Sequence, residues 1–277
     1  MRIASQLAYL PLKLCAAGLA ALALLAGCAG PQPLPTDRIA AIVASPDRAP
    51  ADRINDTRRK PADMLAFIGV RPGMVALDVS AARGYTTELI ARAVGPKGKV
   101  YGQNAPRAEG RAPPAQAEGA AAPPAPAATP AATPAPTLVE RARTMSNIVA
   151  VTRPFEDPAP PEVANGALDM VTLMFNYHDF GHLGVDRARM NQAIFRALKP
   201  GGIYVIADHS GRTGTGISES GTLHRVEEAF VRREVESAGF RLLAQGNFLR
   251  NPADPRDRNT PEPPMPKDEF VLKFVKP

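Results

Sequence analysis

Apolar side chains recur at two different spacings along the chain after residue 57. One set of segments places them three or four positions apart, which is typical of one helix face; these segments are residues 61–70, 85–95, 138–145, 186–199 and 222–239. A second set consists of short apolar runs typical of buried strands; these are residues 74–79, 98–103, 147–151, 168–175 and 203–208. Because the two sets alternate, the pattern predicts an α/β fold in which helices cover both faces of a parallel sheet.

The end of the chain departs from this alternation. Residues 240–248 and 269–275 both have strand patterning, and no helix is predicted between them. Consecutive strands without a crossover helix indicate antiparallel pairing. We therefore predict a mostly parallel sheet with one antiparallel strand at its edge.

Two segments show neither spacing. Residues 29–56 contain several prolines and few large apolar side chains, and we interpret residues 28–56 as a tether. Residues 105–137 are rich in alanine and proline and lack apolar periodicity, which predicts a disordered insertion. The remainder, residues 57–277, is expected to form one domain that this insertion interrupts.

The N-terminus has the pattern of a secretory signal. Basic residues precede an apolar run, residues 15–28, that is too short to span a membrane. The run ends in the sequence LAGC, which resembles the lipobox of bacterial lipoproteins and implies lipidation of Cys28. A secretory signal with a chance cysteine is the alternative. With residues 1–27 as a lipoprotein signal peptide, we expect a lipid-anchored envelope protein, and Ala29 favours the outer membrane, facing the periplasm.

Composition removes several classes of chemistry. Cysteine occurs only at positions 15 and 28, so the mature domain is expected to contain no disulfide, catalytic thiol or cysteine-ligated metal. The formal net charge is +6, and the densest basic cluster is Arg58-Arg59-Lys60. We interpret that cluster as the solvated start of a helix, so no nucleic-acid partner is expected.

One junction between a predicted strand and a predicted helix has the position of a cofactor loop. It is the sequence ALDVSAARGY, residues 76–85, and ligands of parallel α/β sheets bind outside the carboxyl ends of the strands. The stretch that contains this junction, residues 73–102, and two later stretches, residues 168–179 and 198–210, resemble class I S-adenosylmethionine-dependent methyltransferases. The segments at residues 60–74 and 248–277 resemble more specifically a group of predicted bacterial methyltransferases, some of them secreted or lipoproteins.

The resemblance implies a Rossmann-like sheet with a reversed final strand, S-adenosyl-L-methionine as the cofactor, and methyl transfer to an unidentified acceptor. The first loop of the family has an acidic residue followed by glycines at alternate positions, and the matching residues here are Asp78, Ser80, Ala82 and Gly84. If Ser80 or Ala82 must adopt a positive φ in place of glycine, the strain is roughly 1 kcal/mol or more. The alternative is a loop that only joins a strand to a helix.

The resemblance places further residues against the cofactor. Arg83 either blocks the pocket or pairs with the cofactor's carboxylate, and Tyr85 follows on the same loop. Gln103, or Asn104 beside it, stands where the family has a carboxylate that binds the ribose hydroxyls. Phe155 either packs on the adenine or belongs to the core. The predicted contacts are completed by the residues after the fourth strand, Asn176 and Tyr177.

Catalytic candidates lie at the ends of two strands. His178 and the pair Asp208-His209 follow the fourth and fifth predicted strands, at the edge that faces the substrate. His178 is a candidate general base for an acceptor oxygen or nitrogen, and both histidines can instead be hydrogen-bonded structural residues. His178 and His182 would share one helix face, but Gly181 argues against a helix there, and no metal site is predicted.

Two functions fit these observations. One is S-adenosylmethionine-dependent methyl transfer by an envelope lipoprotein, which the retained Asp78 and Gly84 and the polar strand ends favour. The other is a catalytically silent binding or structural module of the envelope, which the replaced glycines and the missing ribose carboxylate favour. A nicotinamide dehydrogenase is disfavoured because the Gly-x-Gly-x-x-Gly motif is absent from the sequence.

Overall fold

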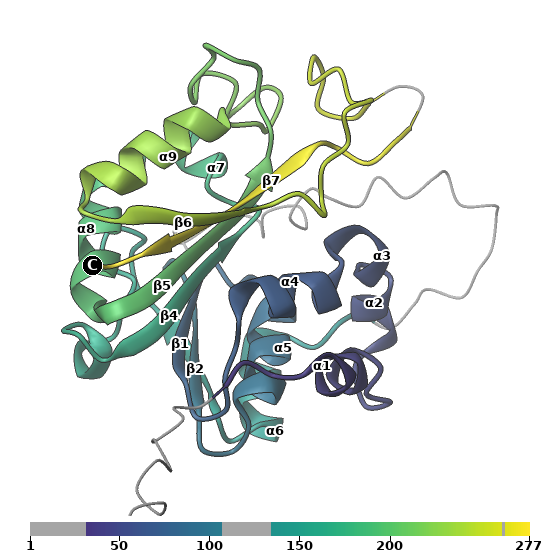
Figure 1. Ribbon diagram of the computed structural model, residues 1–277, viewed down its shortest axis with the longest axis vertical. Coiled ribbons are helices and arrows are strands. Elements are labelled where there is room, and N and C mark those ends of the chain that lie inside the picture. Colours follow the sequence, from purple (N-terminus) through teal and green to yellow (C-terminus); the bar gives the residue numbers. More distant parts are fainter. Residues whose placement is uncertain (1–31, 107–133, 262–263) are drawn as a thin grey trace, which may run out of the picture. The chain divides into compact units, whose positions relative to one another are not determined.

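A sheet of seven strands runs through the part of the chain that the structure describes, in the order β3-β2-β1-β4-β5-β7-β6 (Figure 1). The computed structural model describes residues 32–106, 134–261 and 264–277. The strands are β1 (Val75–Val79), β2 (Lys99–Asn104), β3 (Ile148–Thr152), β4 (Leu168–Met174), β5 (Leu198–His209), β6 (Arg241–Gly246) and β7 (Glu269–Val275). β1 pairs in parallel with β2 and β4, β2 pairs with β3, and β4 pairs with β5. The predicted mostly parallel sheet is confirmed.

The final strand is reversed, as predicted, but it does not lie at the edge. β7 is antiparallel to both of its neighbours, β5 and β6, and is inserted between them. β6 occupies the edge, where its side chains alternate between exposed and half-buried positions, whereas most of β7 is buried. The prediction of an antiparallel edge strand is therefore wrong. The nearly continuous apolar run of β7 fits a strand covered on both faces.

Helices cover both faces of the sheet (Figure 1). One apolar cluster joins Leu65 and Ile90 to Met170 of β4, and a second joins Met190 to the next residue of that strand, Val171. Because neighbouring residues of a strand point to opposite faces, the two clusters mark the two sides of the sheet. On the first side lie α1 (Thr36–Val43), α4 (Pro61–Ile68), α5 (Tyr85–Val94) and α6 (Leu138–Thr144); on the second lie α7 (Asp179–His182), α8 (Arg187–Ala197) and α9 (Glu228–Ser237).

The helix predicted over residues 222–239 begins later than expected. α9 starts at Glu228, because the preceding segment forms a parallel bridge between Val226 and Ser210 and stays extended there. A short 3₁₀ turn also occurs at Pro161–Val163. Among the helices that the structure describes, none has the length and apolar character needed to cross a bilayer.

The predicted tether is wrong for most of residues 28–56. Helices α1, α2 (Pro50–Arg53) and α3 (Asp56–Arg59) occupy this segment, and Ile39 and Ile42 belong to the core. Arg48 pairs with Asp56 at 2.7 Å, which closes the turn between α1 and α3. These helices are short and contain few large apolar residues, so the apolar pattern that identifies longer helices is weak here.

The structure does not describe residues 1–31, which include Cys28, or residues 107–133. The predicted signal peptide and most of the predicted insertion therefore lie outside the described residues. The folded chain resumes inside the range predicted for the insertion. Thr137 is the N-cap of α6: its hydroxyl accepts a hydrogen bond from the Glu140 backbone N–H, and the Glu140 carboxylate accepts one from the Thr137 N–H at 2.6 Å. This capping box fixes the start of α6.

Candidate functional site

The loop after β1 keeps the backbone of a glycine loop without two of its glycines. Ser80, Ala82 and Gly84 have φ angles of 57°, 51° and 88°. All three lie in the left-handed region, which costs a non-glycine residue roughly 1–2 kcal/mol. The strain anticipated from the sequence is therefore present at both replaced positions.

Two amide side chains at the end of β2 hold this loop in place. The Ser80 N–H donates to Gln103 Oε1 at 3.0 Å, and the Ala82 N–H donates to Asn104 Oδ1 at 2.8 Å. Asn104 Nδ2 donates back to the Ala82 carbonyl at 3.0 Å, and Gln103 Nε2 donates to the Arg153 carbonyl at 2.6 Å. Gln103, predicted to contact a cofactor, therefore uses its amide oxygen to position the loop and one amide hydrogen to bond the chain after β3.

Asp78 lies beneath the loop and joins three elements. Its carboxylate is buried and accepts hydrogen bonds from the hydroxyls of Thr87 on α5, at 2.6 Å, and Thr172 on β4, at 2.8 Å. Burial raises the pKa of Asp78 to about 6, although both hydroxyls oppose the increase. The carboxylate thus fixes the ends of β1 and β4 relative to α5.

Arg83 and Tyr85 point to different places. Arg83 is exposed and donates from Nε to the Ala135 carbonyl at 2.7 Å, so it neither blocks a pocket nor faces one, and both predicted roles are wrong. Gly84 makes a close approach to α6, because an added Cβ would lie 3.0 Å from Leu138 Cδ1. The Tyr85 ring faces the interior, and its hydroxyl donates to Asp56 Oδ1 at 2.7 Å.

A mainly apolar cavity opens beside the loop. Its empty volume of about 330 Å³ includes space that is open to solvent. The lining comes from α4, α5 and the end of β4, with Arg59 as its charged member: Arg59, Pro61, Met64, Leu65, Ile68, Tyr85, Thr86, Leu89, Ile90, Met174 and Phe175.

Arg59 lines this cavity, and Arg58 contacts one of its aromatic residues, Phe175. The Arg59 guanidinium lies 5.0 Å from the ring centroids of both Tyr85 and Phe175, and Arg58 lies 4.8 Å from the Phe175 centroid and pairs with Glu269 at 2.7 Å. In the described part of the chain, the buried Nε atoms of both arginines have no hydrogen-bond partner. Burial, with the neighbouring Arg58 charge, lowers the pKa of Arg59 to about 10, which leaves it charged. The interpretation of this cluster as a solvated helix start is wrong for both residues.

Two predicted cofactor contacts belong instead to the other face of the sheet. Tyr177 is fully buried, donates its hydroxyl to Glu234 at 2.7 Å and accepts from Asn191 Nδ2 at 3.1 Å, so its prediction is wrong. Phe155 packs on Phe180 with centroids 4.6 Å apart, as the core alternative predicts.

His178 lies between two carboxylates. Its Nδ1 is 2.6 Å from Asp208 Oδ1, and its Nε2 is 3.1 Å from Asp179 Oδ1. Burial opposes a charge on the ring, but the Asp208 and Asp179 carboxylates outweigh it and raise the pKa of His178 to about 10. An imidazolium has no lone pair to accept a proton, so the general-base prediction for His178 is wrong while both carboxylates are ionised. Asn176 donates to Asp179 Oδ2 at 3.1 Å and orients this carboxylate.

Asp208 and His209 have distinct surroundings. Asp208 is fully buried and accepts backbone hydrogen bonds from His178 at 2.8 Å and His209 at 2.7 Å, which makes it a positioning residue. His209 Nδ1 lies 3.0 Å from Glu269 Oε1, but the contact lacks hydrogen-bond geometry. Burial and the nearby Lys267 charge lower the pKa of His209 well below its usual value, so the ring is neutral.

All of the chain's histidines meet at this edge of the sheet. The sequence contains four, and the ring centroids of His178 lie 5.3 Å from His209 and 5.7 Å from His224, while His182 lies 5.7 Å from His224. Gly181 does not prevent a helical turn at α7, which the Ser220 hydroxyl supports by accepting the His182 N–H at 2.8 Å. His224 could not be predicted to join this cluster, because it lies 42 residues from His182 in the chain.

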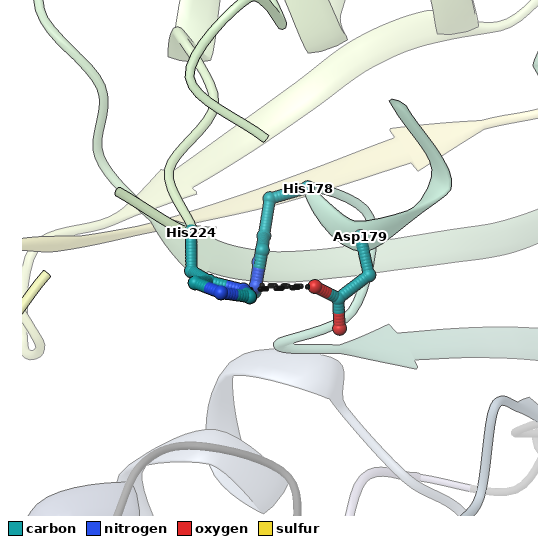
Figure 2. Close-up of side chains that lie close together, drawn as sticks. All are labelled: His178, Asp179 and His224. Carbon is teal, nitrogen blue, oxygen red and sulfur yellow. Dashed lines mark hydrogen bonds and ion pairs between the residues drawn. The ribbon is translucent and has the colours of Figure 1, made fainter. Parts of the chain in front are cut away.

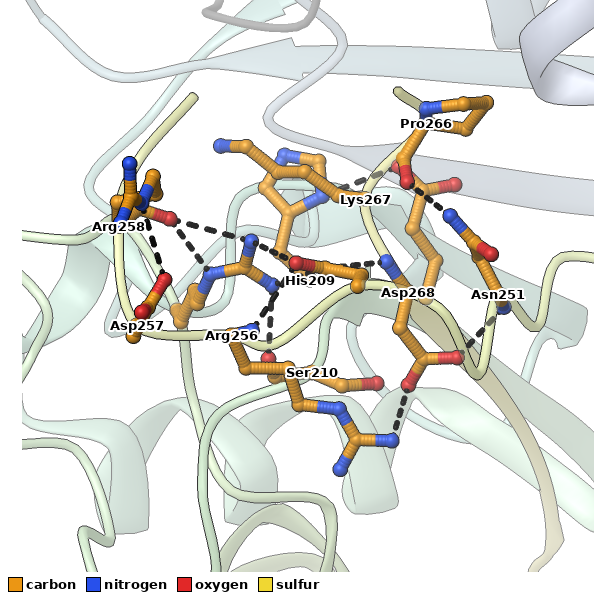
Figure 3. A network of polar contacts seen from close by, with 12 residues as sticks. His209, Ser210, Asn251, Arg256, Asp257, Arg258, Pro266, Lys267 and Asp268 are labelled. Carbon is orange, nitrogen blue, oxygen red and sulfur yellow. Dashed lines mark hydrogen bonds and ion pairs between the residues drawn. The ribbon is translucent and has the colours of Figure 1, made fainter. Parts of the chain in front are cut away.

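A polar network fixes the segment between β6 and β7 over this edge (Figure 3). Asp268 accepts from the Asn251 N–H at 2.8 Å and pairs with Arg256 at 2.8 Å, and Asn251 Nδ2 donates to the Pro266 carbonyl at 2.6 Å. These contacts hold the start of β7 next to His209.

Comparison with known proteins supports the fold. No protein-family model matches the chain, and no curated protein does. An S-adenosylmethionine-dependent methyltransferase from Aquifex aeolicus superimposes with a TM-score of 0.53 at 16% identity, covering 88% of this chain and 100% of that one. A putative methyltransferase from Haloferax volcanii, solved with the Trm112 methyltransferase activator, gives 0.50 at 18% identity over 87% and 97%. A putative methyltransferase from Bacillus halodurans gives 0.50 at 15% identity over 78% and 98%. The chain therefore has the Rossmann-like fold of class I methyltransferases.

Proposed function

We propose that this protein binds S-adenosylmethionine beside β1 and β4 and transfers its methyl group to an acceptor at the edge formed by β4 and β5. The observation that carries the proposal is the backbone of the loop. Ser80 and Ala82 hold the left-handed conformations that glycines supply in this family, and they do so against a steric penalty. Strained backbone concentrates at functional sites, and a loop that only joined a strand to a helix would not require it.

The cavity fits the amino-acid end of this cofactor. The unpartnered Nε–H groups of Arg58 and Arg59 are suited to a carboxylate, and Tyr85 and Phe175 offer aromatic faces of the kind that attract a cation such as a sulfonium. The nucleoside end has less support, since Gln103 and Asn104 are engaged with the loop and carry no charge. We therefore expect weaker binding than a carboxylate at the end of β2 would give.

His209, whose ring is neutral, is the general base in the proposed reaction. The bound cofactor would provide an electrophilic methyl group, and the protein must remove a proton if the acceptor is protonated. Among the described residues, neither ring nitrogen of His209 has a hydrogen-bond partner, so the neutral ring keeps one nitrogen lone pair as the proton acceptor. Asp208 positions both His178 and His209 through their backbone N–H groups.

Thermal unfolding of the full-length protein in detergent tests the proposal. S-adenosylmethionine at about 100 times its dissociation constant should stabilise the fold by about 2.7 kcal/mol and raise Tm by several degrees. We expect Arg59→Gln to abolish most of the shift, and Lys97→Gln, which removes an exposed charge elsewhere, to leave it unchanged. Equal shifts in the two variants would contradict the assignment of Arg59 to the cofactor.

A catalytically silent module of the envelope is the second candidate. It is favoured by the guanidinium of Arg59, which already lies over both aromatic rings of the cavity, and by the amides of Gln103 and Asn104, which hold the loop. If neither the parent nor the Ser80→Gly, Ala82→Gly double variant is stabilised by millimolar cofactor, the silent module is the correct function.

We also propose that the protein is a bacterial lipoprotein of the outer membrane, facing the periplasm, and belongs with secreted methyltransferase-like proteins. The support is the sequence LAGC at the end of an apolar run with basic residues before it. Cys28→Ser should abolish incorporation of labelled fatty acid and release the protein from the membrane fraction. Retention of the label in that variant would contradict lipidation at Cys28.

A further inference from the structure

The cluster of histidines contains a set of atoms suited to a metal ion. One ring nitrogen each from His178 and His224 and one carboxylate oxygen of Asp179 lie within 4.8 Å of one another. Figure 2 shows the two imidazole rings and the carboxylate converging from separate segments, the end of β4 with α7 and the chain before α9.

Two of the three distances between these atoms are close to those around a small ion, and the third lies within 4.8 Å. His178 Nε2 and the Nδ1 of His224 lie 3.1 Å and 3.2 Å from Asp179 Oδ1. A tetrahedral ion held about 2.0–2.1 Å from each donor separates two donors by about 3.3 Å. The site therefore needs little rearrangement to accept an ion.

The neighbours of these residues orient them as in protein metal sites. Asp208 lies 2.6 Å from Nδ1 of His178, which places the ring proton on that nitrogen and directs Nε2 toward Asp179. Asn176 donates to the second oxygen of Asp179 at 3.1 Å. Metal-binding histidines commonly donate their other N–H to a carboxylate, and ligating carboxylates are themselves hydrogen-bonded.

The cluster is also accessible. The His178 side chain is 4% exposed, whereas those of Asp179 and His224 are 23% and 26% exposed. The buried ligand fixes the geometry, and the open side leaves an approach for the ion and a position for a further ligand such as water. Three protein ligands with an open position are typical of reactive rather than purely structural zinc sites.

We propose that Nε2 of His178, Nδ1 of His224 and Oδ1 of Asp179 bind one divalent transition-metal ion of the zinc class. Two imidazoles and one carboxylate select such ions over magnesium, which prefers oxygen ligands. The ion takes the place of the proton between His178 and Asp179. This proposal differs from the expectation of no metal site. Its ligands are not the pair His178 and His182, because His182 Nδ1 lies 4.0 Å from Asp179 and contacts Ser220 Oγ at 2.9 Å.

Equilibrium dialysis of the full-length protein against Zn²⁺ tests this site, using protein in detergent that carries no histidine tag. We expect one Zn²⁺ per chain, with Mg²⁺ in excess unable to displace it. Asp179→Asn and His224→Gln should each weaken Zn²⁺ binding by more than about 100-fold, since even outer-shell changes cost about 10–100-fold.

His182→Gln is the matched control, because it makes the same chemical change beside the site and should leave the affinity within about 3-fold. Tm measured without metal checks that each variant folds. Absence of Zn²⁺ binding by the parent, or an affinity reduced as much by His182→Gln as by His224→Gln, would overturn the proposal. Zn²⁺ binding needs no S-adenosylmethionine, so this result and the thermal shift with cofactor succeed or fail separately.

Discussion

Ser80 and Ala82 show most directly how single residues shape this site. Each holds a positive φ, and the amides of Gln103 and Asn104 bond to the loop at these two residues. Their types and spacing could be predicted from the sequence as those of an altered glycine loop. The bracing amides could not, because their partners are backbone groups more than 20 residues away.

Replacing either strained residue with glycine should leave stability unchanged or increase it by up to about 1.5 kcal/mol. Glycine relieves roughly 1–2 kcal/mol of steric penalty and adds about 0.5–1 kcal/mol of backbone entropy cost. Urea unfolding of Ser80→Gly and Ala82→Gly measures the net effect. Ala66→Gly, at an exposed position of helix α4, is the control and should destabilise by about 1 kcal/mol. A loss at residues 80 and 82 as large as the control's would contradict the strain.

Asp78 should make stability depend on pH in the direction opposite to most carboxylates. Its pKa is raised to about 6 from 3.8, so the folded chain binds the proton more tightly than the unfolded chain. The stability from this protonation is fully present below pH 3.8 and is lost as pH rises through about 6.

Asp78→Asn cannot titrate, so its free energy of unfolding should rise relative to the parent's by roughly 3 kcal/mol between pH 4 and pH 7, from a shift of about two pKa units. Urea unfolding at several pH values measures this difference. A difference that is constant with pH would show that Asp78 has an ordinary pKa.

A turn after β4 explains why the predicted cofactor contact of Tyr177 is wrong. Phe175 has a φ of 62°, which turns the chain after β4 and ends the alternation of side chains that a strand would continue. Tyr177 consequently joins the core near α8 and α9. Such a turn at a non-glycine residue has no clear sequence signal.

At the scale of elements, all strands and most helices were predicted from apolar spacing, whereas the three N-terminal helices were not. The longer helices and all strands lie where apolar spacing placed them. Helices α1 to α3 were missed because ion pairs with distant residues contribute to holding them. Arg141 on α6 pairs with Asp52 on α2 at 2.7 Å and with Glu88 on α5.

Arg141→Ala should destabilise the protein by about 3–5 kcal/mol, because it leaves the buried carboxylate of Asp52 without its cation and leaves Glu88 with Arg92 alone. Arg143→Ala, an exposed position on the same helix, should change stability by less than about 0.5 kcal/mol. Thermal or urea unfolding of both variants compares them. Small changes in stability of similar size in both variants would mean that α6 does not anchor the N-terminal helices.

At the scale of the whole molecule, the alternation of strands and helices was sufficient to predict the class of fold. It could not predict that β7 enters between β5 and β6, since pairing partners of strands are set by three-dimensional packing rather than by chain order. The candidate site also depends on three-dimensional packing. Its residues come from segments that meet only in the folded chain: α3, the loop after β1, the ends of β4 and β5, and the segment before α9.

The proposed function requires this strained loop to bind a methyl donor. Equilibrium dialysis of methyl-labelled S-adenosylmethionine against the full-length protein in detergent measures this directly. We predict saturable binding of one molecule per chain that Arg59→Gln weakens and Lys97→Gln does not. Absence of saturable binding up to millimolar concentrations, in the parent and in the double glycine variant alike, would contradict the claim and identify the protein as a silent member of the fold.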